Sequence, residues 1–210
     1  MAVNTFDKLN MPQEEELPYK PRSIPYEKYF GEMELEEEEK KDRIELAEKF
    51  EVLLLYFFLL YQEDKEKNYE SMISDRYEAI ANEFLGSKRT SAYIKEYACK
   101  YAQELQETTK KHDGDEWYLS IDRARFGAEN EANSVGSYRE QTKAVKDGKR
   151  YKTWVTMKDR YVRHAHIEVD ETTIGIFEDF HVGNSVMAFP KASTGSPEEV
   201  VNCRCVLRYS

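Results

Sequence analysis

The sequence predicts an α+β fold in which an elongated, mainly helical region precedes a small mixed α+β module at the C-terminus. Two observations lead to this prediction. Apolar residues recur at three- and four-residue spacing through most of residues 32–146, which is typical of helices that bury one face. From Tyr151 the pattern changes to alternation between two faces, and glycine and proline interrupt short segments, as in small strands joined by turns. We therefore divide the chain into residues 1–30, 31–148 and 149–210.

The composition limits the class of protein. The chain has 210 residues, of which 40% are hydrophobic and 34% charged, so a packed core is expected and wholesale disorder is not. The net charge of −10 excludes a protein that coats DNA with its whole surface, because phosphate binding needs clustered Lys and Arg. The longest apolar run, Val52 to Tyr61, is ten residues long, whereas a membrane span needs about 20. With three cysteines and no secretory signal, we expect a reducing cytoplasm where the protein is made.

Residues 1–30 are expected to form an extended arm. They contain four prolines and almost no apolar periodicity: Pro12, Pro18, Pro21 and Pro25. Proline lacks an amide donor and biases the preceding residue towards extended geometry. Two interpretations stay open, a disordered leader and an arm that docks on a neighbouring subunit.

Residues 32–66 are expected to form one long helix. Its apolar stripe consists of Ile44, Ala47, Phe50, Leu54, Phe58 and Tyr61. Four glutamates, Glu36 to Glu39, lie at its start, where negative charge suits the positive end of the helix dipole. A second stripe predicts the next helix, which Gly86 ends: Tyr69, Ile73, Tyr77, Ile80 and Phe84.

Two further helices are expected to complete this region. Thr90 is expected to open the first of them, whose inward residues are Ile94, Tyr97, Ala98, Tyr101 and Leu105. Cys99 lies beside this stripe and is expected to be a packed or half-exposed thiol, not a nucleophile. Asp115 is expected to cap the last helix, which covers residues 116–146 and stops at Gly148.

The C-terminal module is expected to begin with a strand over residues 151–157. In this strand Tyr151, Thr153, Val155 and Met157 alternate with Lys152, Trp154 and Thr156. The chain is expected to close on another strand, because Val201, Cys203, Cys205 and Leu207 would then share one face.

A basic stripe crosses the boundary between the helical region and the module. From Lys143 to Arg163, eight basic residues face only two acidic ones. The candidates for contact with nucleic acid are Lys146, Lys149, Arg150, Lys152, Lys158 and Arg160. The alternative is a solvated helix end and strand edge that pairs with the acidic helices of the protein itself.

A polar constellation combines a histidine segment with the two terminal cysteines. On a helix, Asp159, Arg163 and His166 would face one way and approach Cys203 and Cys205. His164, His166, Cys203 and Cys205 are weak candidates for zinc ligands, because their i, i+2 spacing is uncommon in structural sites. The interpretation favoured here is a hydrogen-bonded knot without metal, in which Arg163 and His166 pair with Asp159 or Asp170.

A catalytic interpretation would use His166, Asp159 and Glu199 as acid and base, or Cys203 as a nucleophile. The sequence has no nucleophile elbow, no phosphate-binding loop and no HExxH motif. We therefore expect no enzymatic activity and no cofactor.

These same residues resemble the C-terminal module of phage minor head proteins, also called head morphogenesis or Mu F-like proteins. The similarity covers about residues 120–208, and the matching order is Trp154, Asp159, Arg163, His166, Phe189-Pro190-Lys191, Glu199 and Asn202-Cys203-Arg204-Cys205. Gly127-Ala128-Glu129 is a partial match to a helical element of the family. This chain departs from the family at Asp170-Glu171, where many members have Asp-Gly.

The resemblance implies an internal structural component of a tailed phage head. Such a protein would contact the portal and other head proteins in multiple copies, take part in procapsid assembly and in DNA packaging or delivery, and touch packaged DNA. It would lie in the virion, inside the capsid or at the portal vertex, and in the host cytoplasm during assembly, with no membrane. A nucleic-acid-acting enzyme or toxin-like module using His166, Asp159 and Glu199 is the alternative. Within the structural knot, Trp154 would anchor the core, Asp159 would pair with Arg163, and Asn202 would bond a turn.

Overall fold

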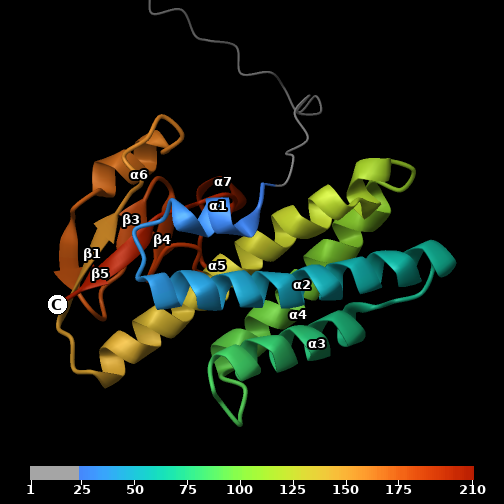
Figure 1. Cartoon of the computed structure of the whole chain (residues 1–210), viewed down its shortest axis with the longest axis horizontal. Coiled ribbons are helices and arrows are strands. Elements are labelled where there is room, and N and C mark those ends of the chain that lie inside the picture. The colour runs from blue at the N-terminus through green and yellow to red at the C-terminus, as the bar shows by residue number, and fades with distance from the viewer. Residues whose placement is uncertain (1–23) are drawn as a thin grey trace, which may run out of the picture.

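The computed structural model describes residues 24–210 and confirms an α+β fold (Figure 1). Its first part is helical: α1 (Tyr26–Gly31), α2 (Glu37–Glu63), α3 (Glu70–Phe84), α4 (Ala92–Lys111), the 3₁₀ helix η1 (Glu116–Leu119) and α5 (Ile121–Lys146). Its second part is mixed: β1 (Tyr151–Val155), α6 (His164–Val169), β2 (Thr173–Gly175), β3 (Phe180–Val182), β4 (Ser185–Met187), α7 (Pro197–Val200) and β5 (Val206–Tyr209). None of the helices in this described range is long and apolar enough to cross a membrane.

The predicted arm is wrong at its C-terminal end. Tyr26–Gly31 form a helix that follows Pro25, and the side chains of Tyr26, Tyr29 and Phe30 are buried in the helical core. Three aromatic residues within five positions were enough to bury one turn and a half against α2. The rest of the arm, residues 1–23, lies outside the described residues.

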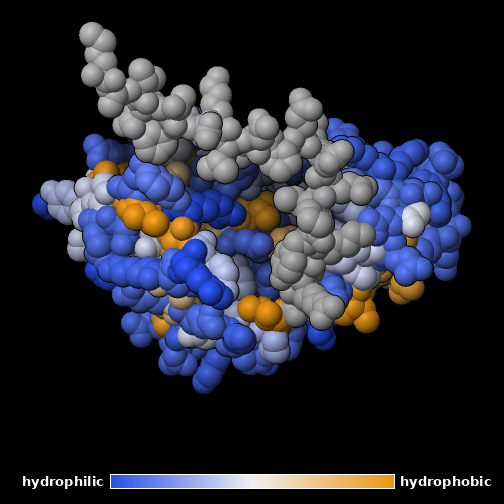
Figure 2. All heavy atoms as spheres, turned by 90° about the horizontal axis from the view of Figure 1, so that it is seen from above, coloured by the Kyte–Doolittle hydropathy of each residue, from blue (hydrophilic) through white to orange (hydrophobic). Residues whose placement is uncertain are grey.

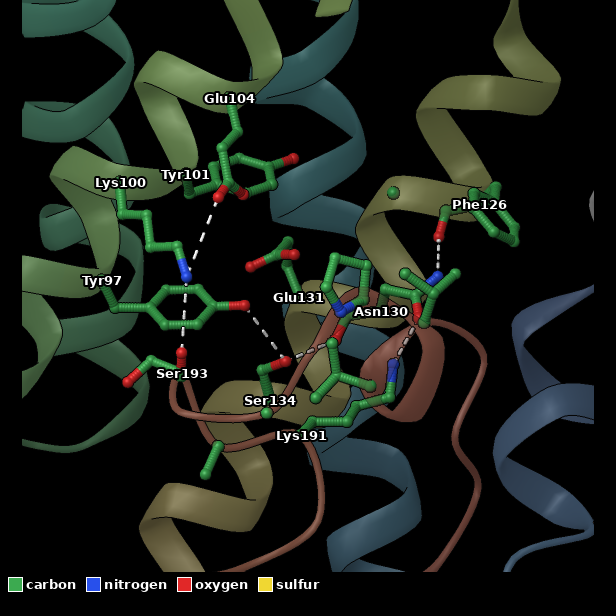
Figure 3. A pocket seen from close by; sticks show the side chains of 16 residues that line it. Tyr97, Lys100, Tyr101, Glu104, Phe126, Asn130, Glu131, Ser134, Lys191 and Ser193 are labelled. Carbon is green, nitrogen blue, oxygen red and sulfur yellow. Dashed lines mark hydrogen bonds and ion pairs between the residues drawn. The ribbon is translucent and has the colours of Figure 1, made fainter. Parts of the chain in front are cut away.

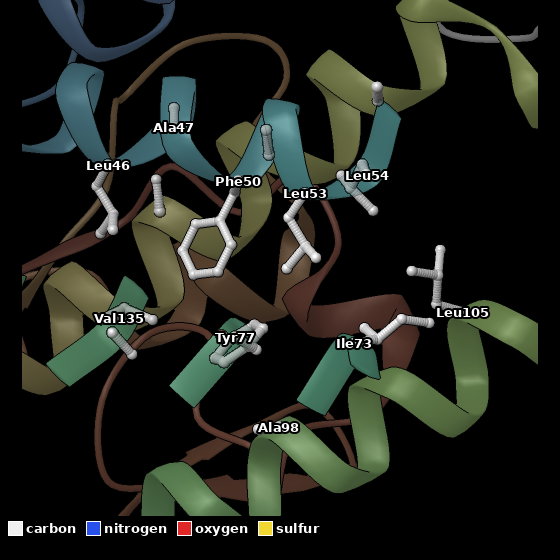
Figure 4. Packing of buried hydrophobic residues seen from close by; sticks show 14 of the residues in the cluster. Leu46, Ala47, Phe50, Leu53, Leu54, Ile73, Tyr77, Ala98, Leu105 and Val135 are labelled. Atoms are coloured by element: carbon white, nitrogen blue, oxygen red, sulfur yellow. The ribbon is translucent and has the colours of Figure 1, made fainter. Parts of the chain in front are cut away.

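The helical core is built on the packing of α2 against α5. Large apolar residues of α2 face small ones on α5, where Ala124, Ala128 and Ala132 are fully buried. At Gly127 an added Cβ would lie 2.9 Å from Leu54 Cδ1, so the two helices approach closely there. Helices α3 and α4 close the other side of this core (Figure 4), where Phe50 and Leu53 of α2 meet Ile73 and Tyr77 of α3.

The first residues of two helices differ from the prediction, because serine side chains cap them. Helix α4 begins one residue later than expected, because the Ser91 hydroxyl accepts from the amide of Ile94. Asp115 caps only the short η1, and Ser120 caps α5 through the amide of Arg123. The predicted helix over residues 116–146 is therefore two elements. Gly86 and Gly148 end their helices with positive φ angles of 60° and 73°, as expected.

The C-terminal module contains a three-stranded antiparallel sheet in the order β2-β1-β5 and a separate hairpin, β3-β4. In the sheet, Trp154 lies opposite Leu207. These strands and the loops around them enclose a second core of nine buried residues: Trp154, Phe180, Val182, Met187, Phe189, Ala192, Cys203, Cys205 and Leu207. The predicted closing strand is confirmed only at its end, because β5 covers Val206–Tyr209 and Val201, which is exposed, precedes it.

Candidate functional site

The site begins at one buried histidine where three segments of the module meet. His166 comes from α6, Glu199 from α7, and Cys203 and Cys205 from the segment that leads into β5. His166 Nε2 lies 2.8 Å from Glu199 Oε2, and His166 Nδ1 lies 3.3 Å from Cys205 Sγ and 3.7 Å from Cys203 Sγ. We call these four residues the His166 cluster. The structure thus brings together the histidine and the two cysteines that the sequence singled out.

The walls of the His166 cluster hold its members in place. The indole of Trp154 is fully buried and meets the His166 ring edge-on, with ring centroids 5.7 Å apart. Gly183 has a φ of 56°, and a Cβ there would lie 2.4 Å from Glu199 Oε1. Only glycine leaves room for this carboxylate beside the imidazole.

The charges in the cluster stabilise one another. Burial alone would lower the pKa of His166, but hydrogen bonds to Cys203 and Glu199 outweigh it and raise that pKa. The pKa of Cys203 is lowered by its hydrogen bond with Cys205 and by His166, although burial opposes the shift. Cys203 and His166 therefore favour each other's charged forms, and Glu199 lies within hydrogen-bond distance of the other ring nitrogen.

The predicted ion pair between Asp159 and Arg163 is wrong. Helix α6 begins only at His164, so Asp159 and Arg163 do not share a helix with His166. The Asp159 carboxylate instead binds Arg204, with Nη2 2.6 Å from Oδ2, and Arg163 donates to the carbonyl of Val201. Asp159 is therefore engaged away from the imidazole, and the set His166, Asp159 and Glu199 is not assembled as an acid–base triad.

Arg204 and His164 also differ in role from what the sequence indicated. Arg204 extends its second amino group to Glu32, 3.4 Å away, and so connects the module to the segment after α1. His164 is exposed and lies 3.2 Å from Glu168, so it does not belong to the His166 cluster.

Asn202 acts through its backbone. Its side chain is exposed, and its φ of 56° places it in the left-handed region that asparagine tolerates. Its amide donates to Asn130 Oδ1 at 2.9 Å. The predicted side-chain bond to a turn is replaced by a sharp bend that directs both cysteines towards His166.

Asn130, Glu131 and Asn133 form a polar seam on α5 that was not expected from the sequence. Asn130 accepts from Lys191, and Asn133 donates to the carbonyl of Cys203 at 2.9 Å. Tyr77 donates to the buried carboxylate of Glu131 at 2.9 Å. Lys191, Asn130 and Glu131 line one side of a cavity of about 260 Å³ between α4, α5 and the segment before α7 (Figure 3). The sequence did contain a signal for this seam, the run from Glu129 to Ser134. Polar residues there occupy nearly all positions around the helix, so some of them must face the core.

Glu129, which lies in the partial match to the family, is expected to make the free energy of unfolding depend on pH. Burial raises the pKa of Glu129 to about 7, against the pull of Lys191. The unfolded chain loses this proton near pH 4.5, so the contribution of Glu129 to the free energy of unfolding decreases as the pH rises from about 4.5 to 7 and is constant above that range. The glutamine in Glu129→Gln cannot ionise. This variant is therefore expected to lose up to about 3 kcal/mol less of its free energy of unfolding as the pH rises. Urea unfolding at pH 5 and pH 8 measures it, with the exposed Glu38→Gln as control; a pH slope equal to that of the wild type would contradict the prediction.

The predicted basic stripe is divided in the structure. Lys152 is fully buried, and its ammonium donates to the carbonyl of Ala188 at 2.6 Å, so it is removed from the candidates for nucleic acid. Lys158 pairs with Glu171 at 2.7 Å. Arg160 stays exposed and lies over the ring of Tyr161. Lys146, Lys149 and Arg150 are exposed at the end of α5, and in the described part of the chain none of the three forms an ion pair.

Comparison with known proteins identifies the family. The model of the family described as phage Mu protein F like protein matches residues 94–208, more than half of the chain. No curated protein and no solved structure matches the chain. The matched range starts earlier than the expected residue 120 and includes most of α4, all of α5, the polar seam and the His166 cluster. The chain therefore belongs to the family of phage Mu protein F like proteins, which suggests a phage head morphogenesis protein.

Proposed function

We propose that this protein is a minor structural component of a phage head that binds near the portal and supports procapsid assembly and DNA packaging or delivery. The family implies other phage head proteins as partners and the virion as the location. The observation that carries the proposal is the extent of the family match, which covers two helices and the module as one packed body. Val155 and Val206 of the module's sheet are buried in the helical core, so the matched parts present one rigid surface.

The proposed role is structural and has no catalytic step. His166, Cys203 and Cys205 are buried beside a core that contains Trp154, Phe180 and Leu207. Asp159 is bound to Arg204. The face seen in Figure 2 is mostly hydrophilic where the described residues are visible, with separate hydrophobic patches. Mixed surfaces of this kind suit contacts that form late in an assembly, when the protein has already folded by itself.

The position of the protein in particles tests this proposal. Procapsids and mature particles are purified and analysed by mass spectrometry, and cross-linking identifies the neighbours. We expect the protein in both kinds of particle, in several copies, with cross-links to the portal protein. Absence from procapsids and virions alike would overturn the proposal, and cross-links to the major capsid protein alone would overturn the portal location.

Contact with DNA is expected to depend on the exposed basic end of α5. Neutralising Lys146, Lys149 and Arg150 together with glutamine should weaken binding at low salt for any sequence. The slope of log affinity against log salt concentration should become shallower by about 0.9 for each DNA phosphate that the variant no longer neutralises. Fluorescence anisotropy with a labelled duplex measures both effects.

A matched variant separates this effect from total charge. Lys88 and Arg89 lie exposed just before α4 and Lys95 in its first turn, and their triple glutamine variant has the same net charge as the first triple variant. It should bind DNA as the wild type does. Equally weakened binding in the two triple variants would show that charge alone controls binding and that the end of α5 makes no specific contact.

A further inference from the structure

The described residues contain one group of His, Cys or acidic side chains that meets the geometry of a metal site. Its ligand atoms are His166 Nδ1, Cys203 Sγ and Cys205 Sγ, which all lie within 4.8 Å of one another, and all three residues are buried. We propose that these three residues bind one zinc ion, and that this ion fastens α6 to the segment that leads into β5.

The distances in the cluster fit tetrahedral zinc. Zinc binds sulfur at about 2.3 Å and histidine nitrogen at about 2.0–2.1 Å, so neighbouring ligand atoms lie about 3.5 Å (N···S) to 3.8 Å (S···S) apart. The two observed distances from His166 Nδ1 to the cysteine sulfurs, 3.3 and 3.7 Å, lie on either side of the first value. The two sulfurs lie within 4.8 Å of each other, so an ion that binds both at tetrahedral zinc geometry draws them together by up to about 1 Å.

The other side of the imidazole has the partner that zinc-binding histidines usually have. Glu199 Oε2 lies 2.8 Å from Nε2, and a proton on Nε2 would leave the lone pair of Nδ1 directed at the two sulfurs, as zinc binding requires. A ligating histidine that donates its second N–H to a carboxylate has a defined tautomer and ring orientation. Gly183 makes space for Glu199, and Trp154 limits the rotation of the ring. Gly183 and Trp154 thus fix the orientation of the imidazole with Nδ1 facing the two sulfurs.

The i, i+2 spacing of Cys203 and Cys205 is uncommon for zinc ligands, but the bend at Asn202 makes it compatible with binding one ion. In an extended strand, residues i and i+2 are about 6.6 Å apart and their side chains run parallel. Here Asn202, directly before Cys203, has a left-handed backbone conformation, and β5 begins only at Val206. The segment with the two cysteines is therefore not part of a strand. The two sulfurs can therefore occupy two corners of one tetrahedron.

The fourth corner has room for a water molecule. A hollow of about 20 Å³ adjoins the cluster and is lined in part by Met157, Tyr161 and Arg163. This volume exceeds the roughly 10–15 Å³ that one water needs. Arginine stays cationic and cannot serve as a ligand, so the fourth ligand is a water in this hollow.

Metal analysis of the full-length protein, purified with a reductant and dialysed after growth in zinc, is the first test. We expect one zinc per chain in the wild type and in Cys99→Ser, whose cysteine is exposed and lies outside the cluster. Cys203→Ser, Cys205→Ser and His166→Gln should each lose the ion. Less than a tenth of an equivalent in the wild type, or the same content in all variants, would overturn the proposal.

A second measurement uses the unaltered protein, in case the variants fail to fold. Cobalt added to the reduced, zinc-free protein should give thiolate-to-metal charge-transfer absorption at one equivalent. Zinc should protect Cys203 and Cys205 from iodoacetamide while Cys99 is still labelled, and chelation should lower Tm and remove that protection. No thiolate band, or labelling of all three cysteines at rates independent of zinc, would show that the imidazole–thiol contact is the whole site. These results do not depend on where the protein lies in the particle.

Discussion

Trp154→Ala is expected to lower the free energy of unfolding by about 3–5 kcal/mol, the range for removing a large aromatic residue from a core. The indole is fully buried in the second core. It packs edge-on against Phe180, with centroids 5.1 Å apart, and against His166 of the cluster. Alanine leaves a cavity that the surrounding strands cannot fill, because β1 is held in register between β2 and β5. For a chain of this size the loss corresponds to a decrease in Tm of roughly 10 °C.

Urea unfolding followed by far-ultraviolet circular dichroism measures this effect. Phe177→Ala is the matched control, because it removes an aromatic side chain of the same module that is 84% exposed. The control should change the free energy of unfolding by less than about 0.5 kcal/mol. Equal effects of the two substitutions would show that Trp154 is not the anchor of the module.

Arg43→Ala is expected to destabilise the helical core by a similar amount, about 3–5 kcal/mol, because it leaves buried acceptors without their cation. The Arg43 side chain is fully buried between α2 and α5. Its guanidinium lies 3.0 Å from Glu39 and 3.1 Å from Glu140, and it also donates to the side chain of Asn133. Arg43 therefore connects the two long helices at a position where both carboxylates are largely buried.

Two further variants separate the buried charge from its exposed counterpart. Arg125→Ala removes another arginine that links α5 to α2, through Glu51 at 3.0 Å, but this arginine is half exposed. It should cost no more than about 1 kcal/mol in the same urea experiment. Gly136→Ala should also destabilise, because its Cβ would lie 2.5 Å from Arg43 Nε and displace the guanidinium. A decrease in stability for Arg125→Ala as large as for Arg43→Ala would contradict this account.

Much of the fold could be predicted from local patterns, and the reason is physical. A helix that buries one face needs apolar residues every three or four positions, so the stripes of α2, α3 and α4 were readable without knowing what they pack against. Alternation revealed β1 in the same way. The pattern failed at Tyr26–Gly31, where four prolines upstream suggested an arm and a helix of six residues was too short to show a period.

The candidate site was predicted in its members and not in its contacts. His166, Cys203 and Cys205 were identified together, and they do meet. Lys152 was assigned to a basic surface, because its own side chain gives no information about the face of β1 on which it lies. The partner of Asp159 is Arg204, 45 residues away along the chain. Ion pairs at such separation depend on how segments cross, which no local spacing encodes.

By itself, the sequence determined the α+β class, the existence of the four long helices, the first strand of the module and the group of residues that carry the family resemblance. Those features follow from interactions between residues close in the chain or from residue type alone. Only the tertiary structure decided that Arg43, Glu131 and Lys191 are buried, that Glu199 lies beside His166, and that a bend at Asn202 brings two sulfurs to one imidazole. These outcomes depend on contacts between distant segments, whose free energy is gained only when the whole chain has packed.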